Sequence, residues 1–317
     1  MPRGSVIIPV YNGEAFIEDA LESVFAQTFR DFEVIVINDG STDGTEERLG
    51  KYRDRINYVK QENRGLAATR GRGVALARAP LVAFLDADDM WLPRKLEGQV
   101  EAAGEHPECG IITTDALSFS DSGVVVPSLK DWYRPACGNV VENLLFGNWI
   151  PPSAAMIRRE CFEHVKTFDV PPPGYGEDWM MWMQVAAHFA VHYIDEVLVR
   201  RRLHSNSMSG QNEDIQFRCV LRNFEIIRKR VPRLNGRPSL IDEAAFRVCL
   251  SRGMRDIRAV RLPEARDKLK RALEYKPHSF KARAAQAATY VPGWAFGLLK
   301  HIDARARRMR GQPAGPL

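Results

Sequence analysis

The chain has 317 residues, of which 45% are hydrophobic and 27% charged, so it can bury a full core and is long for one compact domain. Its net charge of +5 comes from 45 basic and 40 acidic residues, a small surplus that gives no sign of nucleic-acid binding, and we expect none. The five cysteines are far apart and form no CxxC pair, which fits reduced thiols. The first apolar run is short and is interrupted by Pro9, which does not fit a signal peptide, and no apolar run reaches membrane-spanning length. We therefore expect a cytoplasmic protein.

The first third of the chain alternates between apolar runs and helical patterns. Residues 5–10 (SVIIPV) predict a strand buried on both faces, and Asn12 then offers an N-cap for a helix that runs to residue 27. A second buried strand covers residues 32–37 and ends in NDGSTDGT, which is typical of a loop followed by a helix start. The pattern continues with a strand at 57–60, a helix at 67–77, a strand at 81–86, a helix after Pro93 and a strand at 110–114.

This alternation predicts an α/β fold, in which a mostly parallel sheet is covered by helices on both faces. Ligands of such sheets bind beyond the carboxyl ends of the strands. Three polar stretches, YNGE, NDGSTDG and DADD, follow predicted strands. We therefore expect them to meet at one edge of the sheet and to form the functional site.

The second half of the chain is predicted to become helical. From residue 118 to 152 the pattern weakens, so we expect loops with some strands, followed by a helix over 177–189 and a strand over 192–204. Beyond residue 212 the sequence indicates helices throughout. We divide the chain into an α/β domain, residues 1–210, and an α-helical C-terminal region, residues 211–317.

Three carboxylates stand within four positions in FLDADDMW, and they repel one another when ionised. One interpretation is that Asp86, Asp88 and Asp89 cap the helix that Pro93 opens. The other is a bound cation, because carboxylate oxygens suit Mg²⁺ or Mn²⁺, and such an ion keeps positions open for substrate phosphates. His204 is a further candidate ligand, although a histidine at a strand end has an ordinary structural explanation as well.

Several side chains near the other two polar stretches are candidates for nucleotide binding. The carboxylate of Asp39 accepts hydrogen bonds, as a base edge or a ribose hydroxyl requires, although Asp is also common in turns. Tyr11 can lie flat against a nucleobase or be an ordinary half-buried tyrosine. Arg64 and Arg70 can each pair with a phosphate or lie on the surface of a helix.

Glu177 and Asp178 open the predicted helix that contains Trp179 and Trp182. Acidic residues are favoured at helix N-termini by the helix dipole, which is one explanation for the pair. The other explanation is a general base that removes a proton from a sugar hydroxyl, with the two indole rings holding the sugar. The sequence around the pair leaves both explanations open.

Six segments occur in order and at fitting distances, and together they resemble the family 2 glycosyltransferases, which are inverting enzymes with the GT-A fold. The segments are VIIPVYNGEAFIEDALESVFAQTF, VIVINDGSTDGT, ENRGLAATRG, VAFLDADDMW, GED and RRLHSNSMS. The resemblance covers roughly residues 5–209. It implies a Rossmann-like, mostly parallel sheet for the first domain.

The resemblance also implies roles for single residues. Pro9, Tyr11 and Asp39 would hold the nucleobase, and Arg70 would lie beside the base and the phosphates. Asp86 would lie near the ribose.

The same resemblance implies a metal site and a catalytic base. Asp88 would contact the Mg²⁺ or Mn²⁺ ion, although Asp89 is an alternative contact, and His204 matches a late histidine that helps to bind the metal and the pyrophosphate. Asp178 would be the base.

The expected activity is inverting transfer of a sugar from a nucleoside-diphosphate sugar, with UDP favoured, to an acceptor hydroxyl in cell-surface polysaccharide or glycolipid assembly. The acceptor would be a saccharide or a lipid-linked saccharide. The alternatives are a non-catalytic nucleotide-sugar-binding protein, a nucleotidyltransferase, and a glycoside hydrolase that uses paired carboxylates.

The C-terminal tail carries a possible membrane contact. Residues 293–310 place an apolar helical stripe among lysine and arginine side chains. Such a helix either packs on the helical region or lies on an anionic membrane surface, and we favour peripheral contact with the inner face of the cell membrane.

Overall fold

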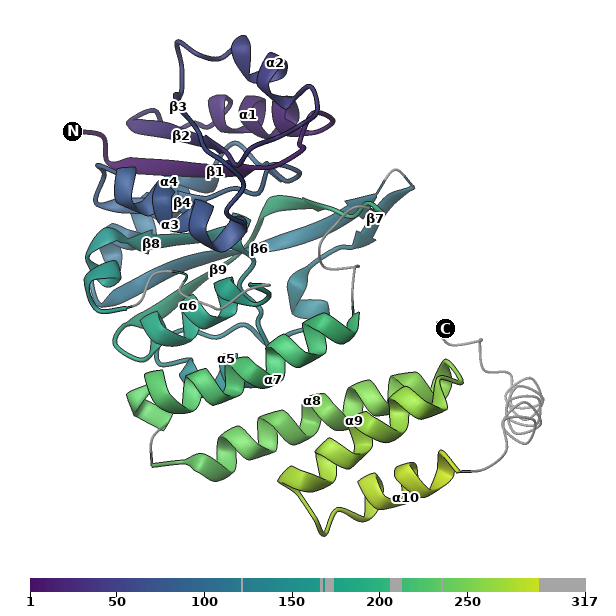
Figure 1. Ribbon diagram of the computed structural model, residues 1–317. Coiled ribbons are helices and arrows are strands. Elements are labelled where there is room, and N and C mark those ends of the chain that lie inside the picture. The colour runs from purple at the N-terminus through teal and green to yellow at the C-terminus, as the bar shows by residue number, and fades with distance from the viewer. Residues whose placement is uncertain (121, 166–167, 169–173, 206–212, 235, 291–317) are drawn as a thin grey trace, which may run out of the picture. The chain divides into compact units, whose positions relative to one another are not determined.

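The computed structural model describes residues 1–120, 122–165, 168, 174–205, 213–234 and 236–290. The chain forms two compact units, Met1–Asn235 and Gly236–Leu317 (Figure 1). The predicted boundary between residues 210 and 211 lies within 206–212, outside the described residues. Helix α7 (Glu213–Arg230) belongs to the first unit, where it contacts helix α6 (Glu177–Ala186).

The described residues of the first unit form one nine-stranded sheet in the order β3-β2-β1-β4-β8-β6-β9-β5, with β7 paired to β6. The strands are β1 (Gly4–Val10), β2 (Phe32–Asn38), β3 (Asn57–Lys60), β4 (Leu81–Phe84), β5 (Met90–Trp91), β6 (Cys109–Ser120), β7 (Gly123–Val126), β8 (Ala155–Arg158) and β9 (Ala190–Arg202). The four strands β3, β2, β1 and β4 pair in parallel, as do β6 and β9, whereas β8 is antiparallel to both of its neighbours. The predicted α/β class is confirmed, with antiparallel pairs confined to the half of the sheet beyond β4.

The helices of the first unit follow the predicted alternation in its parallel half. In addition to α6 and α7, they are α1 (Ile17–Phe25), α2 (Thr45–Gly50), α3 (Leu66–Leu76), α4 (Lys95–Glu105) and α5 (Val141–Leu145), with single 3₁₀ turns η1 (Leu129–Asp131), η2 (Pro152–Ala154), η3 (Arg159–Glu163) and η5 (Pro232–Leu234). The prediction that Asn12 caps the first helix is wrong. Asn12 has a φ of 52°, and its side-chain oxygen accepts a hydrogen bond from the Thr42 amide at 2.8 Å. It therefore joins two loops, and α1 begins five residues later.

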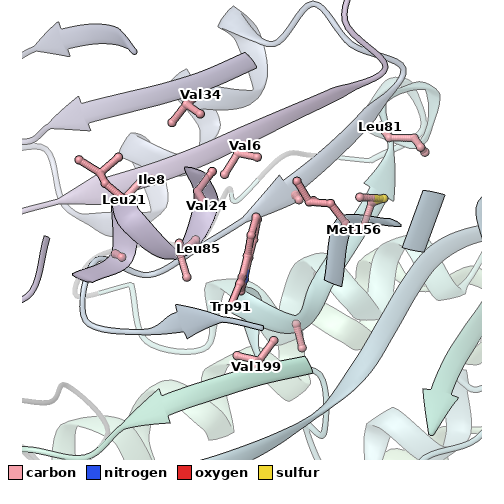
Figure 2. Close-up of a cluster of buried hydrophobic side chains, with 14 of the residues drawn as sticks. Val6, Ile8, Leu21, Val24, Val34, Leu81, Leu85, Trp91, Met156 and Val199 are labelled. Carbon is pink, nitrogen blue, oxygen red and sulfur yellow. The ribbon is translucent and has the colours of Figure 1, made fainter. Parts of the chain in front are cut away.

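A buried apolar cluster fixes the parallel strands against α1 and the β4–α4 segment (Figure 2). Every residue of β1 is buried, as expected for a central strand covered on both faces. Leu21 and Val24 of α1 pack on this cluster, and Trp91 and Val199 extend it toward β5 and β9. The rigid sheet holds the ends of β1, β2 and β4 at one edge, where the polar stretches begin.

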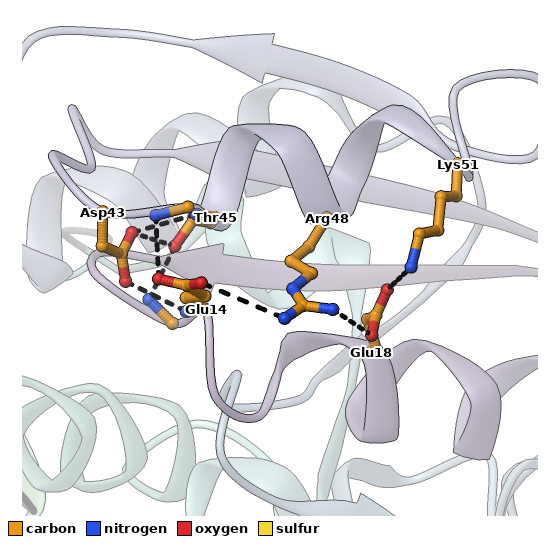
Figure 3. A network of polar contacts seen from close by, with 8 residues as sticks. Glu14, Glu18, Asp43, Thr45, Arg48 and Lys51 are labelled. Atoms are coloured by element: carbon orange, nitrogen blue, oxygen red, sulfur yellow. Dashed lines mark hydrogen bonds and ion pairs between the residues drawn. The ribbon is translucent and has the colours of Figure 1, made fainter.

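Polar contacts hold the loop after β2 against the start of α1 (Figure 3). The Asp43 carboxylate accepts hydrogen bonds from the amides of Glu14 and Thr45, both at 3.1 Å, and the Glu14 carboxylate accepts one from the Gly44 amide at 3.0 Å. Asp43 therefore has a structural role in this turn. Ion pairs of Glu18 with Arg48 and Lys51 are partly exposed, so they orient α2 and add little stability.

The described residues of the second unit are α-helical, as predicted. They contain α8 (Pro238–Arg258), α9 (Leu262–Tyr275) and α10 (Phe280–Ala288). Asp256 is buried between α8 and α9 and accepts hydrogen bonds from Lys268 at 2.6 Å and Arg261 at 2.5 Å. None of the helices in the described part of the chain is long and apolar enough to cross a membrane. The tail at residues 293–310 lies outside that part.

The packing of α3 on β1 gives a prediction about stability. A Cβ atom on Gly73 would come within 2.3 Å of Ile7 Cγ2, whereas a Cβ atom on Gly98 of α4 would meet nothing within 4 Å. We expect Gly73→Ala to lower the free energy of unfolding by about 1–3 kcal/mol through overpacking. Gly98→Ala should raise it by about 0.5–1 kcal/mol, because alanine favours the helix. Urea unfolding of both variants checks this, and equal effects would contradict the packing.

Candidate active site

Apart from Pro9 and Tyr11 at the end of β1, the predicted site residues come from five places in the first unit, and the structure links most of them through shared contacts. They are Asp39 after β2, Arg70 on α3, the three aspartates after β4, Glu177 and Asp178 at the start of α6, and His204 after β9. Pro9 is buried within β1, and Tyr11 just after it is half exposed. The Asp39 amide donates to the Val10 carbonyl at 2.8 Å, which places Asp39 beside the end of β1.

Asp39 organises the loop that leads into α3. Its buried carboxylate accepts hydrogen bonds from the Gln61 side chain at 2.6 Å and from the amides of Arg64 and Gly65, both at 2.9 Å. Gly65 allows this loop to form because its φ of 81° is one that other residues rarely adopt. A carboxylate has about four lone-pair sites, so Asp39 can still accept a hydrogen bond from a ligand.

Arg70 occupies the centre of the site and is only 1% exposed. Its guanidinium bridges two carboxylates, that of Asp86 after β4 and that of Glu177 at the start of α6. Burial alone would lower the pKa of Arg70. The charges of the two carboxylates outweigh that effect and raise the pKa above its ordinary value, so the group stays ionised. The surface-helix explanation for Arg70 is therefore wrong, because its charged end is buried and faces the two carboxylates.

Glu177 and Asp178 begin α6 with their side chains directed to other elements. Burial raises the pKa of Glu177 to about 7, against the opposing effect of Arg70. Asp178 accepts hydrogen bonds from the Asn148 side chain at 2.9 Å and from the Trp179 amide at 2.7 Å. Burial raises the pKa of Asp178 above the usual value for aspartate, although Arg70 and these two donors act in the opposite direction. A carboxylate of raised pKa is a stronger base at neutral pH.

Asp88 and His204 form the part of the site that suits a metal ion. The Asp88 carboxylate lies 3.0 Å from His204 Nε2, and both side chains are partly exposed. Burial and the charge of Asp86 raise the pKa of Asp88, whereas the His204 contact lowers it. A carboxylate oxygen and an imidazole nitrogen that converge in this way fit a divalent cation, with positions left for substrate oxygens. The described residues contain no cluster of three or more such ligands.

Asp89 has a structural role that the sequence did not reveal. One carboxylate oxygen accepts from Ser153 Oγ at 2.6 Å, and the other from the Arg202 amide at 3.0 Å. Burial raises the pKa of Asp89 to about 8, and the charges of Asp88 and Asp86 add to the effect. The prediction that Asp89 caps the next helix is wrong, because α4 has no side-chain cap at its N-terminus. Asp89 instead joins the β4 loop to β9, two residues before His204.

The two tryptophans of α6 do not form a sugar-binding surface. Trp179 is 6% exposed and Trp182 fully buried. Their indole N–H groups donate to the carbonyls of Leu144 at 2.8 Å and Ile150 at 2.9 Å. The expectation that these rings hold a sugar is therefore wrong, because each ring lies in the core and anchors a neighbouring segment.

Three further residues contribute to the site, and sequence patterns did not identify them. Asn148 contacts Asp178, Ser153 contacts Asp89, and the Arg202 guanidinium donates to the Asp88 carbonyl at 3.2 Å. Asn148 lies in the stretch 118–152, where the periodic pattern weakens, and Ser153 follows that stretch directly. Arg202 stands two residues before His204, and its position in RRLH was the one available clue.

Comparison with known proteins gives consistent matches. The family described as Glycosyl transferase family 2 matches residues 5–165. The putative glycosyltransferase EpsH of Bacillus subtilis is 36% identical over 71% of this chain and 67% of its own length. The putative teichuronic acid biosynthesis glycosyltransferase TuaG of the same species is 32% identical over 66% of this chain and 82% of its own. Other relatives are longer, and the match spans 32–40% of three Rickettsia glycosyltransferases.

Two solved structures share the fold. S. aureus TarS 1-349 in complex with UDP has a TM-score of 0.64 at 19% identity, over 92% of this chain and 89% of TarS 1-349. The mannosyltransferase PcManGT from Pyrobaculum calidifontis, in complex with GDP-Man and Mn²⁺, has a TM-score of 0.60 at 20% identity, over 98% of this chain and 88% of its own. These likenesses confirm the predicted GT-A fold.

The buried position of Arg70 predicts a large loss of stability when its charge is removed. Arg70→Met leaves two carboxylates without their partner, which should lower the free energy of unfolding by about 3–5 kcal/mol. Arg72→Met is the matched control, since Arg72 is exposed on the same helix and its hydrogen bond within the described structure goes to the Gln61 side chain. It should change stability by less than about 0.5 kcal/mol. Similar urea midpoints for the two variants would contradict the bridging role of Arg70.

Proposed function

The chain belongs to glycosyl transferase family 2, and on that basis we propose that it transfers a sugar from a nucleoside-diphosphate sugar to an acceptor hydroxyl, with inversion at the anomeric carbon. The bridging contact of Arg70 is the observation that carries the proposal. It brings the aspartates after β4, which suit a metal and a nucleotide, next to the carboxylates of α6, which suit a base. Transfer requires both groups in one site.

We propose UDP as the nucleotide of the donor and a saccharide or a lipid-linked saccharide as the acceptor. TarS structures contain UDP and UDP-GlcNAc, and the PcManGT structure contains GDP-Man, so the fold accommodates nucleotide sugars. The name of TuaG refers to teichuronic acid biosynthesis, which supports a role in assembling cell-surface polysaccharide or glycolipid. We place the protein in the cytoplasm, with peripheral membrane contact through residues 293–310.

In the proposed donor site, Asp39 accepts a hydrogen bond from the base and Asp86 from the ribose, with Pro9 and Tyr11 beside the base. Arg70 holds Asp86 in place through its buried ion pair. Asp88 and His204 would bind Mg²⁺ or Mn²⁺, which supplies positive charge to the pyrophosphate when bound. Mn²⁺ is present in the PcManGT structure.

In the proposed reaction, the Asp178 carboxylate accepts the proton of the acceptor hydroxyl as its oxygen bonds to the anomeric carbon. The bond between that carbon and the diphosphate oxygen breaks at the same time, and the nucleoside diphosphate leaves with the electron pair. Attack on the face opposite the leaving group inverts the configuration. The raised pKa of Asp178 increases its ability to take the proton.

Removal of the base should separate turnover from binding. Asp178→Asn keeps the shape of the side chain but cannot take a proton, so turnover should fall by about 10²–10⁴-fold. Thermal stabilisation by UDP should stay close to wild type, because ligand binding to the native state sets it. Asp54→Asn, at an exposed position, is the control. Turnover can be followed as UDP release from the UDP-sugar that stabilises the protein most, and an Asp178→Asn enzyme of wild-type rate would refute the assignment.

Removal of the metal should weaken nucleotide binding, and so should loss of either proposed ligand, Asp88 or His204. We expect Mn²⁺ to increase the thermal stabilisation by UDP, and EDTA to abolish that increase. Asp88→Asn and His204→Ala should lose most of the Mn²⁺-dependent part, whereas His278→Ala, an exposed histidine of the second unit, should keep it. The same UDP effect in Mn²⁺ and in EDTA would rule out the proposed metal site.

A further inference from the structure

Asn148 contacts the proposed base from a segment 30 residues earlier in the chain. Its Nδ2 donates to Asp178 Oδ2 at 2.9 Å, and the other oxygen of Asp178 accepts from the Trp179 amide at 2.7 Å. The orientation of the Asn148 amide follows from chemistry, since the opposite orientation would set two oxygens against each other. Asn148 Oδ1 is buried, and none of the described groups donates a hydrogen bond to it. The side chain therefore has one hydrogen bond in the described structure, and Asp178 receives it.

Helix α6 itself fixes the position of Asn148. The indole N–H of Trp179 binds the Leu144 carbonyl at 2.8 Å, four residues before Asn148, and that of Trp182 binds the Ile150 carbonyl at 2.9 Å, two residues after it. Both indole rings are buried. The helix that carries the base thus holds the segment carrying Asn148 at two points, so the amide and the carboxylate cannot easily move apart.

The Asn148 amide affects the charge state of Asp178. The charges of Arg70 and Asp86 act on Asp178, whose own charge raises the pKa of Glu177, and Arg70 is already paired with both Asp86 and Glu177. Asn148 therefore supplies a neutral donor that favours the ionised carboxylate. Each oxygen of Asp178 accepts one hydrogen bond and keeps a lone pair that can take a proton.

We propose that Asn148 is the positioning residue of the base, and that its amide fixes the Asp178 carboxylate in the orientation and charge state that accept the acceptor's proton. This inference rests on the proposed function, in which Asp178 is the base. Asn148 acts through Asp178 and takes no part in donor binding. Its loss should therefore change turnover and its pH dependence, and leave nucleotide binding unchanged.

The test uses Asn148→Leu, because leucine keeps the branched shape of asparagine and removes the donor. The ionised form of Asp178 then loses a hydrogen bond, so its pKa rises, and the acid limb of the pH–rate profile should move upward by about one pH unit. The sign follows because a protonated carboxyl cannot take the proton, so activity is lost as pH falls through the pKa. Turnover on the plateau above that limb should fall about tenfold, because a carboxylate that has lost this donor is no longer held in the productive orientation. The KM for the UDP-sugar and the stabilisation by UDP should stay unchanged.

The matched control is Asn143→Leu. Asn143 lies in the same segment, donates one hydrogen bond to the Arg134 carbonyl at 3.1 Å, and also has a buried Oδ1 that accepts from none of the described groups. Its side-chain hydrogen bond in the described structure goes to Arg134 and not to Asp178, so its variant should keep the wild-type profile. If Asn148→Leu does not fold, Asn148→Ala removes the same donor.

A second readout does not depend on activity. In protein labelled with ¹³C-aspartate, the carboxyl resonance of Asp178 is identified by its loss in Asp178→Asn, and its titration gives the pKa directly. We expect a higher midpoint in Asn148→Leu than in wild type and no change in Asn143→Leu. An unchanged midpoint in Asn148→Leu, or an equal rise in both variants, would overturn the inference. A failure of the proposed function would appear separately, as full turnover by Asp178→Asn.

Discussion

The buried guanidinium of Arg70 is the constraint on which the rest of the site depends. A charge at this depth is costly unless it is paired, and Arg70 finds its partners on two separate elements, Asp86 after β4 and Glu177 on α6. The two carboxylates would repel each other without it. Arg70 therefore holds together the side of the site that suits a nucleotide and the side that suits a base, and it does so through the protein interior.

A second buried contact completes the arrangement on the side of the proposed metal ligands, Asp88 and His204. Asp89 accepts from Ser153 and from the Arg202 amide, which ties the β4 loop to the end of β9. Because His204 follows two residues later, this contact places its imidazole beside Asp88. Of the three aspartates in DADD, one thus pairs with Arg70, one faces His204 and one is structural. The mutual repulsion of the cluster is reduced because each carboxylate has a different partner.

Sequence patterns predicted the parallel strands and the polar stretches at their ends, because buried strands and amphipathic helices have a local periodicity. They did not predict which side chains would meet. Asp86 and Arg70 are 16 residues apart and Arg70 and Glu177 are 107 apart, and no local rule encodes such a distance. The stretch that contains Asn148 has no readable period, since its segment is held by the indoles of another element. The burial of Trp179 could not be predicted for the same reason, because the exposure of an aromatic ring is a property of the tertiary fold.

We expect Arg70 and Glu177 to act as one buried unit that holds the proposed base, Asp178, in the site. A double-mutant cycle on turnover, with Arg70→Met, Glu177→Gln and the combined variant, measures this coupling directly. If the pair acts as a unit, the double variant should be little worse than the more severe single variant, with a coupling free energy of about 1–3 kcal/mol. Purely additive losses would show that the two residues contribute independently, and would contradict the account.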